Sequence, residues 1–262
     1  MLLLLMTEME NTKPQKSINT IWSNVWDKQA RLSKVDKILK NQLFVRGYPI
    51  IKKYVPSKKF SFLDIGTGTG RYGIALARDF PESKFVLTDI LEESLAVAKG
   101  LAAHLNIANV EFKQADVFNL PFQDGQFDIV FSDATIQHLK DYRRAFAVMA
   151  QMLRKNGILI VSVNNYWNPH KLFKMIKGKN YEYGFEKSFK IKELKDLAKA
   201  SNCKVLATDG FFVAYCLSRY HPKFMKFAAK ILDASVRLLD SISNRYISKH
   251  FGFEILVVAQ KI

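Results

Sequence analysis

Between residues 60 and 163 the sequence alternates short apolar runs with segments of helical periodicity, and this alternation constrains the fold more than any other feature. The short apolar runs are typical of buried strands. The segments between them repeat apolar residues at three- and four-residue spacing, as one face of a helix does. We therefore predict an α/β fold, with a mostly parallel sheet covered by helices on both faces. The strands are expected at residues 60–65, 84–88, 110–114, 127–132 and 157–163.

The chain is predicted to divide into a flexible tail (1–16), N-terminal helices (17–59) and a main domain (60–262). Within the main domain, residues 164–190 are polar, aromatic and basic without a clear period. An irregular segment of this length inside a compact domain is usually functional, so we interpret it as a lid or a loop that contacts a substrate. Residues 220–248 are predicted to be a helical insertion before the last apolar strand.

Composition limits the setting in which the protein works. The 262 residues carry a net charge of +16, which suits nucleic acid, an anionic membrane surface or an acidic substrate. Lysine is also a common solubilising residue, so the charge alone does not identify the partner. Cys203 and Cys216 lie in apolar runs without metal-ligand spacing, which indicates buried free thiols in a reducing compartment.

The location expected from the sequence is cytoplasmic, with peripheral contact at a membrane surface as an alternative. No run approaches the ~18 apolar residues of a membrane span. The apolar start, Met1 to Met6, has no preceding basic residue and is shorter than the roughly 7–15 apolar residues of a secretory signal. It is interpreted as a frayed tail, or as a start assigned too early with Met6 as the true first residue.

The clearest chemical motif is the Gly-rich turn after the first predicted strand, Asp64-Ile65-Gly66-Thr67-Gly68-Thr69-Gly70. Ligands of open α/β sheets bind beyond the carboxyl ends of the strands, and glycines there let the backbone turn tightly and approach a ligand. The third glycine of the dinucleotide fingerprint is replaced by Arg71, which would crowd the packing of helix on strand. The Lys-Ser or Lys-Thr pair of a phosphate loop is also absent, so a nucleoside without phosphate fits better.

Further side chains could hold such a nucleoside. Asp89, at the end of the second predicted strand, could accept hydrogen bonds from both ribose hydroxyls. Asp116 could accept from an exocyclic amine of a purine, with Val117 and Ile90 on either side of the ring. Taken singly, Asp89 could be only a helix cap and Asp116 only a turn residue. The residues that close the mouth of the fourth strand are Asp133, Ala134 and Thr135.

With these pieces in order, the chain resembles the class I, Rossmann-like methyltransferases that use S-adenosylmethionine, in the branch that modifies small molecules. The resemblance runs from about residue 60 to residue 162. It rests on the Gly-rich turn, on Asp89 and Asp116, and on three later motifs. One departure is Asn156, which stands where the family often has proline and affects a turn rather than the site. The later motifs are Leu120-Pro121-Phe122, Phe127-Asp128-Ile129-Val130-Phe131-Ser132 and Leu153-Arg154-Lys155-Asn156-Gly157-Ile158-Leu159.

The resemblance implies S-adenosyl-L-methionine as the cofactor, and a seven-stranded sheet whose last strand, residues 253–260, runs antiparallel. It implies that the Gly-rich turn holds the methionine part of the cofactor, Asp89 the ribose, and Asp116 with Val117 the adenine. The predicted cofactor-binding residues are Asp64, Gly66, Thr67, Gly68, Gly70, Asp89, Ile90, Asp116, Val117 and Asp133.

The implied reaction passes the methyl group by in-line displacement to an O, N or C atom of a small acceptor, which could be lipophilic. The protein must hold that atom in line with the C–S bond in a dry pocket, and needs a base only if the acceptor starts protonated. His138 is the candidate base, although a residue that starts a helix and packs or touches the cofactor is the simpler interpretation. Tyr166 and His170 are candidates for acceptor binding or plain loop residues, and no metal is expected.

Nucleic acid is the less favoured acceptor. An (Asp/Asn)-Pro-Pro-aromatic run is absent after the fourth strand, where Ser132-Asp133-Ala134-Thr135 stands, and neither cysteine fits the Pro-Cys nucleophile of cytosine C5 methylation. Two alternatives stay open: an RNA or protein methyltransferase, which the basic charge favours, and a cofactor-binding protein without catalysis.

The predicted helix or helix pair at residues 222–246 is amphipathic, and it has two interpretations. Its apolar face could pack on the domain and cover the acceptor pocket, or lie on a membrane near a lipophilic substrate. Because the polar stripe mixes acidic with basic residues, we favour packing. The apolar face is Phe224, Phe227, Ile231, Leu238 and Ile242, and the polar stripe is Lys226, Lys230, Asp233, Arg237, Asp240 and Asn244.

Overall fold

The computed structural model describes residues 20, 22–23, 37–178, 181, 183–215, 223–242 and 245–262. The predicted tail, the alternative start at Met6, residues 17–19, 21 and 24–36 of the predicted N-terminal helices, Cys216 and Asn244 lie outside the described residues, as do the side chains of Phe224 and Lys226.

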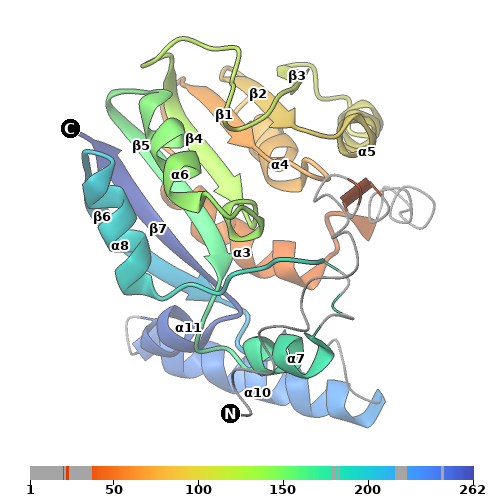
Figure 1. Ribbon diagram of the computed structural model, residues 1–262. Coiled ribbons are helices and arrows are strands. Elements are labelled where there is room, and N and C mark those ends of the chain that lie inside the picture. The colour runs from red at the N-terminus through yellow and green to blue at the C-terminus, as the bar shows by residue number, and fades with distance from the viewer. Residues whose placement is uncertain are drawn as a thin grey trace.

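One sheet of seven strands forms the centre of the described structure, in the order β3-β2-β1-β4-β5-β7-β6 (Figure 1). The first five strands pair in parallel, and β7 runs antiparallel to both of its neighbours, β5 and β6. This confirms the predicted Rossmann-like fold and its antiparallel last strand. The strands are β1 (Ser61–Ile65), β2 (Lys84–Asp89), β3 (Val110–Gln114), β4 (Phe127–Asp133), β5 (Leu153–Asn164), β6 (Cys203–Phe211) and β7 (Glu254–Lys261).

The sheet is buried on both faces because successive side chains of a strand point to opposite sides. In β1, Phe62 packs with α3 (Gln42–Lys52), α4 (Arg71–Asp79) and α5 (Glu92–His104), whereas Leu63 packs with α6 (Tyr142–Gln151). The same second face is covered by α8 (Ile191–Ala200), which packs there through Leu194 and Leu197. Burial on two faces explains why the strands read as nearly continuous apolar runs.

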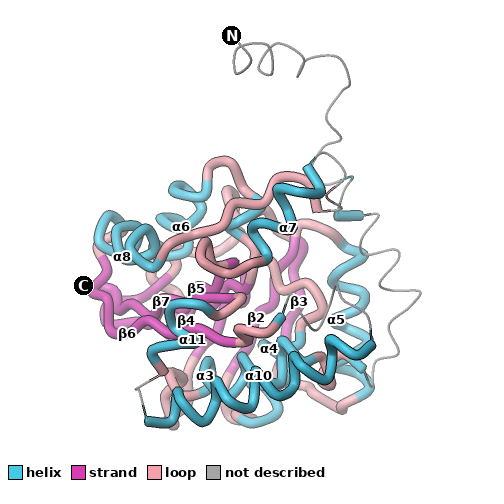
Figure 2. The backbone as a smooth tube through the Cα atoms, turned by 90° about the horizontal axis from the view of Figure 1, so that it is seen from below, coloured by secondary structure: helices cyan, strands magenta, loops and turns pink. Residues whose placement is uncertain are grey.

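One segment differs from the expectation drawn from the sequence: residues 164–190 are not irregular throughout, because they contain the helix α7 (His170–Lys177). The region after β6 is a helix pair, which is one of the two predicted forms. The pair consists of α10 (Lys223–Ile242) and α11 (Tyr246–Phe251), and Arg245, just before α11, has a φ of 61°. Figures 1 and 2 place α7 and α10 at one end of the molecule. No described helix combines the length and the apolar composition needed to cross a membrane.

Candidate active site

The Gly-rich turn leaves β1 in a conformation that requires glycine. Gly66, Gly68 and Gly70 have φ values of 71°, 56° and 71°, in the left-handed region that other residues avoid. The backbone N–H groups of Gly66 and Thr67 both donate to the Thr88 carbonyl at 2.9 Å, which fixes the turn against the end of β2. A Cβ on Gly66 would overlap the Thr135 side chain. Gly66 therefore tolerates no side chain, on either ground.

Asp89, at the end of β2, is held in place from two sides. The Gly68 N–H donates to its Oδ2 at 3.0 Å, and the Leu91 N–H donates to its Oδ1 at 3.1 Å, just before α5 begins. Burial raises the pKa of this carboxyl. Each carboxylate oxygen can accept a second hydrogen bond. Asp89 thus holds the turn that precedes α5, whose N-cap is Leu91, and it also lines a cavity in front of the Gly-rich turn.

Asp64 carries a buried acceptor atom without a partner among the described residues. The Thr67 hydroxyl donates to its Oδ2 at 2.7 Å, whereas Oδ1 is buried and makes no hydrogen bond there. Burial raises the pKa of Asp64 to about 8. A buried carboxylate oxygen without a donor is costly, so its presence beside a cavity indicates a site for a donor or cation that comes with a ligand.

The cavity has a volume of about 670 Å³ and extends along the carboxyl ends of the strands. Past the end of β3 it is lined by Asp116, which is exposed, and by Val117, which is buried; Ile90 lies on the same lining. Asp116 also accepts the Phe118 N–H at 2.9 Å, so it is a turn residue as well. Nine of the ten predicted cofactor-binding residues line this cavity. The exception is Gly70, where a Cβ would come within 2.7 Å of Ile74 Cδ1 and 2.8 Å of Ala98 Cβ, so this glycine serves packing.

Three charged side chains, Arg71, Asp133 and Glu254, line the cavity beside the end of β4. Arg71 donates to Asp133 Oδ2 at 2.8 Å, and the Ser162 hydroxyl donates to Asp133 Oδ1. Glu254, the first residue of β7, is buried beside them, and its pKa is raised by burial and by the Asp133 charge. The expectation that Arg71 would crowd the helix packing is wrong, because its side chain turns to the cavity instead.

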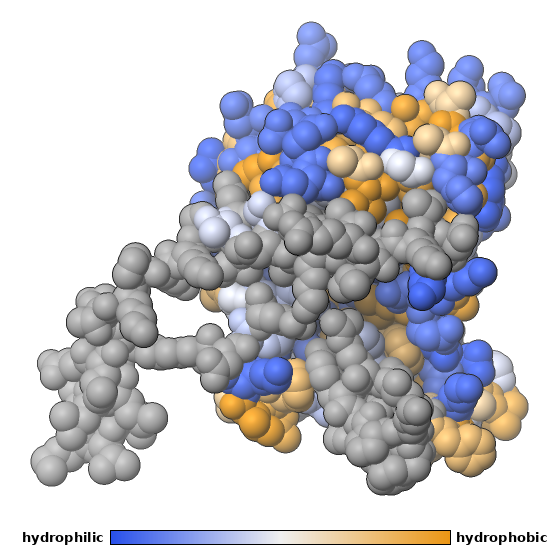
Figure 3. All heavy atoms as spheres, turned by 90° about the vertical axis from the view of Figure 1, so that its right-hand side faces the viewer, coloured by the Kyte–Doolittle hydropathy of each residue, from blue (hydrophilic) through white to orange (hydrophobic). Residues whose placement is uncertain are grey.

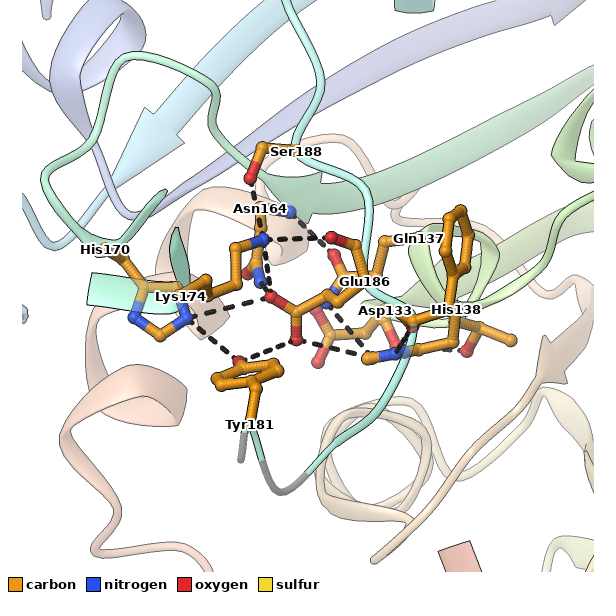
Figure 4. A network of polar contacts seen from close by, with 11 residues as sticks. Asp133, Gln137, His138, Asn164, His170, Lys174, Tyr181, Glu186 and Ser188 are labelled. Atoms are coloured by element: carbon orange, nitrogen blue, oxygen red, sulfur yellow. Dashed lines mark hydrogen bonds and ion pairs between the residues drawn. The ribbon is translucent and has the colours of Figure 1, made fainter. Parts of the chain in front are cut away.

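The far part of the cavity is organised by Glu186, a buried carboxylate from the segment after α7 (Figure 4). Lys174 Nζ lies 2.8 Å from Oε1, Asn164 Nδ2 donates to the same oxygen at 2.7 Å, and the Tyr181 hydroxyl donates to Oε2 at 3.1 Å. Burial by itself would raise the pKa of Glu186. The neighbouring His170 and Lys174 side chains outweigh burial and lower the pKa of Glu186 to about 2. The carboxylate is therefore ionised.

His138 and His170 approach Glu186 from opposite sides, and both rings are buried (Figure 4). Each Nε2 lies 3.7 Å from a Glu186 oxygen. The His138 Nδ1 lies 3.1 Å from the Phe185 carbonyl, which can only accept, so Nδ1 holds the proton in the neutral ring and Nε2 is an acceptor. Burial lowers the pKa of His138.

The structure separates the three candidate residues for acceptor chemistry. His138 and His170 line the cavity, but Tyr166 is not among the described residues that do. Its ring lies instead beside two lysines, with Lys171 Nζ 3.4 Å and Lys190 Nζ 4.7 Å from its centroid. Tyr166 thus lies beside these lysines rather than in the lining of the cavity, and we do not assign it to acceptor binding.

Sequence reasoning missed Glu186, Lys174, Tyr181 and Glu254. Glu186 and Tyr181 lie in a segment without a period, and Lys174 lies in the eight-residue helix α7, which was not predicted. Glu254 could have been found, because an antiparallel β7 must start at the edge where β5 ends, and Glu254 is indeed paired with Asn164. Among the described residues, no group of three or more His, Cys, Asp or Glu side chains is arranged to hold a metal.

Comparison with known proteins gives a consistent result. A family model described as "Methyltransferase domain" matches residues 56–215. The demethylmenaquinone methyltransferase of Staphylococcus haemolyticus is 25% identical over 152 residues, covering 58% of this chain and 62% of that protein. This chain thus spans less than two thirds of the length of that curated relative.

Solved structures share the fold. One is an S-adenosylmethionine-dependent methyltransferase of Thermotoga maritima, described as a possible histamine N-methyltransferase, with a TM-score of 0.62 and 18% identity over 94% of this chain and 100% of that chain. Another is phosphoethanolamine N-methyltransferase 2 of Haemonchus contortus in complex with S-adenosyl-L-methionine, with a TM-score of 0.59 and 21% identity over 81% of this chain and 51% of that chain. At these identities the likeness concerns the fold alone.

Proposed function

The chain belongs to the class I methyltransferases that depend on S-adenosylmethionine, and we propose that it transfers the cofactor's methyl group by in-line displacement to an O, N or C atom of a small acceptor. One observation carries the proposal. A single cavity joins the Gly-rich turn, with Asp64 and Asp89, to the group around Glu186 and His138. A donor and an acceptor that share one cavity can be held at reacting distance.

The residues at the turn suit S-adenosylmethionine. The unpartnered Oδ1 of Asp64 suits the amino group of the methionine part, because an ammonium would supply the missing donor and a compensating charge. The remaining lone pairs of Asp89 suit the ribose hydroxyls, and Asp116 with Val117 and Ile90 suits the adenine. When bound, the cofactor supplies an electrophilic methyl group on a sulfonium.

The acceptor would occupy the part of the cavity around Glu186, whose walls are rich in aromatic rings. Trp22 stacks on Tyr183 with 5.6 Å between centroids, and Tyr215 stacks on Phe253 at 3.7 Å. Such walls favour a flat or apolar acceptor and exclude water. The curated relative named for demethylmenaquinone supports a lipophilic molecule of this kind. Residues 164–190 would act as the lid, since they contribute His170, Tyr181 and Glu186 to these walls.

His138 is the proposed general base. Its pKa is lowered by burial, so the ring is neutral at pH 7 and its Nε2 can accept a proton from the acceptor. The ionised Glu186, 3.7 Å away, would then stabilise the imidazolium. The proton therefore moves from the acceptor to Nε2, and His170 is assigned to acceptor binding on the other side of Glu186.

The proposal is tested by a transfer assay with S-adenosylmethionine labelled in its methyl group. The acceptor panel contains quinols, aromatic amines, small carboxylic acids and total RNA. We expect labelled product from a small acceptor with the wild-type chain, and a loss of at least about tenfold with His138→Asn if the base is needed. Transfer to RNA alone would contradict the proposed acceptor class.

Peripheral contact with a membrane is a separate proposal, and it is argued below from the exposed side chains of α7 and α10.

A further inference from the structure

The long helix α10 has its apolar side turned to solvent. With about 3.6 residues per turn, positions 229, 233, 236 and 240 form one stripe and positions 227, 231, 238 and 242 form the opposite one. The first stripe is buried against the protein, whereas Phe227, Leu238 and Ile242 are 68%, 70% and 80% exposed. The expectation that the apolar face packs on the domain is therefore wrong.

The reason for this orientation lies in the two acidic residues of the helix. Asp233 is buried and forms an ion pair with Arg46 of α3. Asp240 is buried as well and accepts the N–H groups of Ile247 at 2.9 Å and Ser248 at 3.2 Å, at the start of α11. Both carboxylates are thus used inside the protein.

What α10 presents to solvent is consequently apolar and basic. Lys230 and Arg237 are exposed beside the apolar stripe, and no acidic residue of the helix shares that side. Among the described side chains of the mixed polar stripe that argued against membrane contact, Asp233 and Asp240 are buried, whereas Lys230 and Arg237 are exposed, with Arg237 Nε 3.5 Å from Asp233 Oδ2. This is the composition of a helix that lies on an anionic lipid surface.

A second helix repeats the pattern. α7 exposes Leu172, Met175 and Ile176, at the spacing of one helix face, and Ile176 is 77% exposed. Lys171 and Lys177 accompany them, and the helix contains no acidic residue. Its first residue, His170, is buried in the cavity wall. The exposed face is thus joined directly to the proposed acceptor site.

Both helices lie at the same end of the molecule. Figure 2 views that end directly, with α7 and α10 on its two sides. In Figure 3 two apolar patches stand at the lower edge of the molecule, one on each side. More than half of the exposed large apolar side chains of the described structure belong to these two helices. Apolar side chains gathered in this way mark an interaction surface.

We propose that α7 and α10 together dock the protein on an anionic phospholipid bilayer, with their apolar stripes inserted at the headgroup boundary. Charge selects this occupant over a second copy of the chain, because two faces that both carry lysines on a chain of net charge +16 repel each other and are attracted by anionic headgroups. Docking goes beyond the proposed methyl transfer, and it would place the cavity beside molecules dissolved in the bilayer.

The test is flotation of the full chain with vesicles of phosphatidylcholine, alone or mixed with phosphatidylglycerol. We expect binding to the mixed vesicles that weakens as salt is raised. The double variant Leu238→Glu with Ile242→Glu, and separately Ile176→Glu, should each bind at least about tenfold more weakly. Leu206→Glu is the matched control, because it places the same charge on an exposed leucine of the edge strand β6.

Circular dichroism and titration with S-adenosylmethionine show whether each variant is folded, and vesicle binding is read without any acceptor. A failure of docking is therefore distinguishable from a failure of the proposed transfer. The proposal is overturned if the wild-type chain does not float with mixed vesicles, or if the α7 and α10 variants float as it does. A second result would also overturn it: the wild-type chain forms a dimer without lipid, the α7 and α10 variants do not form that dimer, and neither the wild-type chain nor the variants bind vesicles.

Discussion

At the scale of single residues, Glu186 is the side chain that the other polar residues at the proposed acceptor end of the cavity surround. A buried carboxylate is stable only when its oxygens are paired, and here a lysine, an asparagine and a tyrosine supply the partners at 2.7–3.1 Å. The two histidines complete the group at 3.7 Å. Glu186 thus fixes the segment after α7 and places a negative charge beside the proposed base, whose ring is oriented by the Phe185 carbonyl and Gln137.

Glu186→Gln keeps the shape of the side chain but removes its charge. We expect methyl transfer to fall by about a hundredfold, because the imidazolium of His138 would lose its counter-charge. The affinity for S-adenosylmethionine should change little, since Glu186 lies away from the turn. Initial rates and calorimetric titration measure the two quantities. Glu193→Gln, at a glutamate paired with Lys187, is the control, and equal rates in both variants would exclude the role given to Glu186.

Asp64 makes the stability of the free protein depend on pH. Its pKa is raised to about 8 in the folded chain, so the folded state binds this proton more tightly than the unfolded state does. Stability from this group is present at low pH and is lost as pH rises toward about 8 and above. The midpoint of thermal unfolding should therefore fall less between pH 5 and pH 8.5 in Asp64→Asn.

The same variant should bind S-adenosylmethionine at least about tenfold more weakly, because it lacks the charge that suits the amino group. Thermal unfolding curves at pH 5 and pH 8.5 test the predicted pH dependence, and calorimetric titration with S-adenosylmethionine tests the predicted affinity. An unchanged pH dependence together with unchanged affinity would show that Asp64 has no such role.

At the scale of elements, the inward-facing acids of α10 connect it to its neighbours. Asp240 acts as a cap for α11, because its carboxylate accepts N–H groups that have no partner within that helix. One side chain, Asp240, thus joins α10 to α11. Because this side chain must point inward, the apolar stripe on the opposite side of α10 faces solvent.

Asp240→Asn should lower the free energy of unfolding by about 1–2 kcal/mol, because the N–H groups of Ile247 and Ser248 would donate to a neutral amide instead of a charged carboxylate. Urea unfolding followed by circular dichroism measures the change. Asp196→Asn, at an exposed position of α8, is the control and should stay within about 0.5 kcal/mol of the wild type. If Asp240→Asn and Asp196→Asn lowered the free energy of unfolding equally, Asp240 would not act as a cap for α11.

At the scale of the whole molecule, the sheet could be predicted from the sequence and the acceptor end could not. Burial on both faces gives the strands an apolar signature, and the turn at Gly66 carries its own conformational requirement. α7 has only eight residues, so its apolar spacing covers little more than two turns, and Glu186 lies in a segment without a period. The packing of α10 was predicted wrongly because the partners of Asp233 and Asp240 lie in other elements, which no local pattern can show.

The central claim is that the cavity at the Gly-rich turn holds S-adenosylmethionine, and calorimetric titration tests it most directly. The wild-type chain should bind S-adenosylmethionine and its demethylated product with micromolar affinity. Asp89→Ala should lose that binding, because its carboxylate is assigned to the ribose hydroxyls, and Asp196→Ala should retain it. If the folded wild-type chain shows no heat of binding with either compound, the cavity at the Gly-rich turn does not hold S-adenosylmethionine.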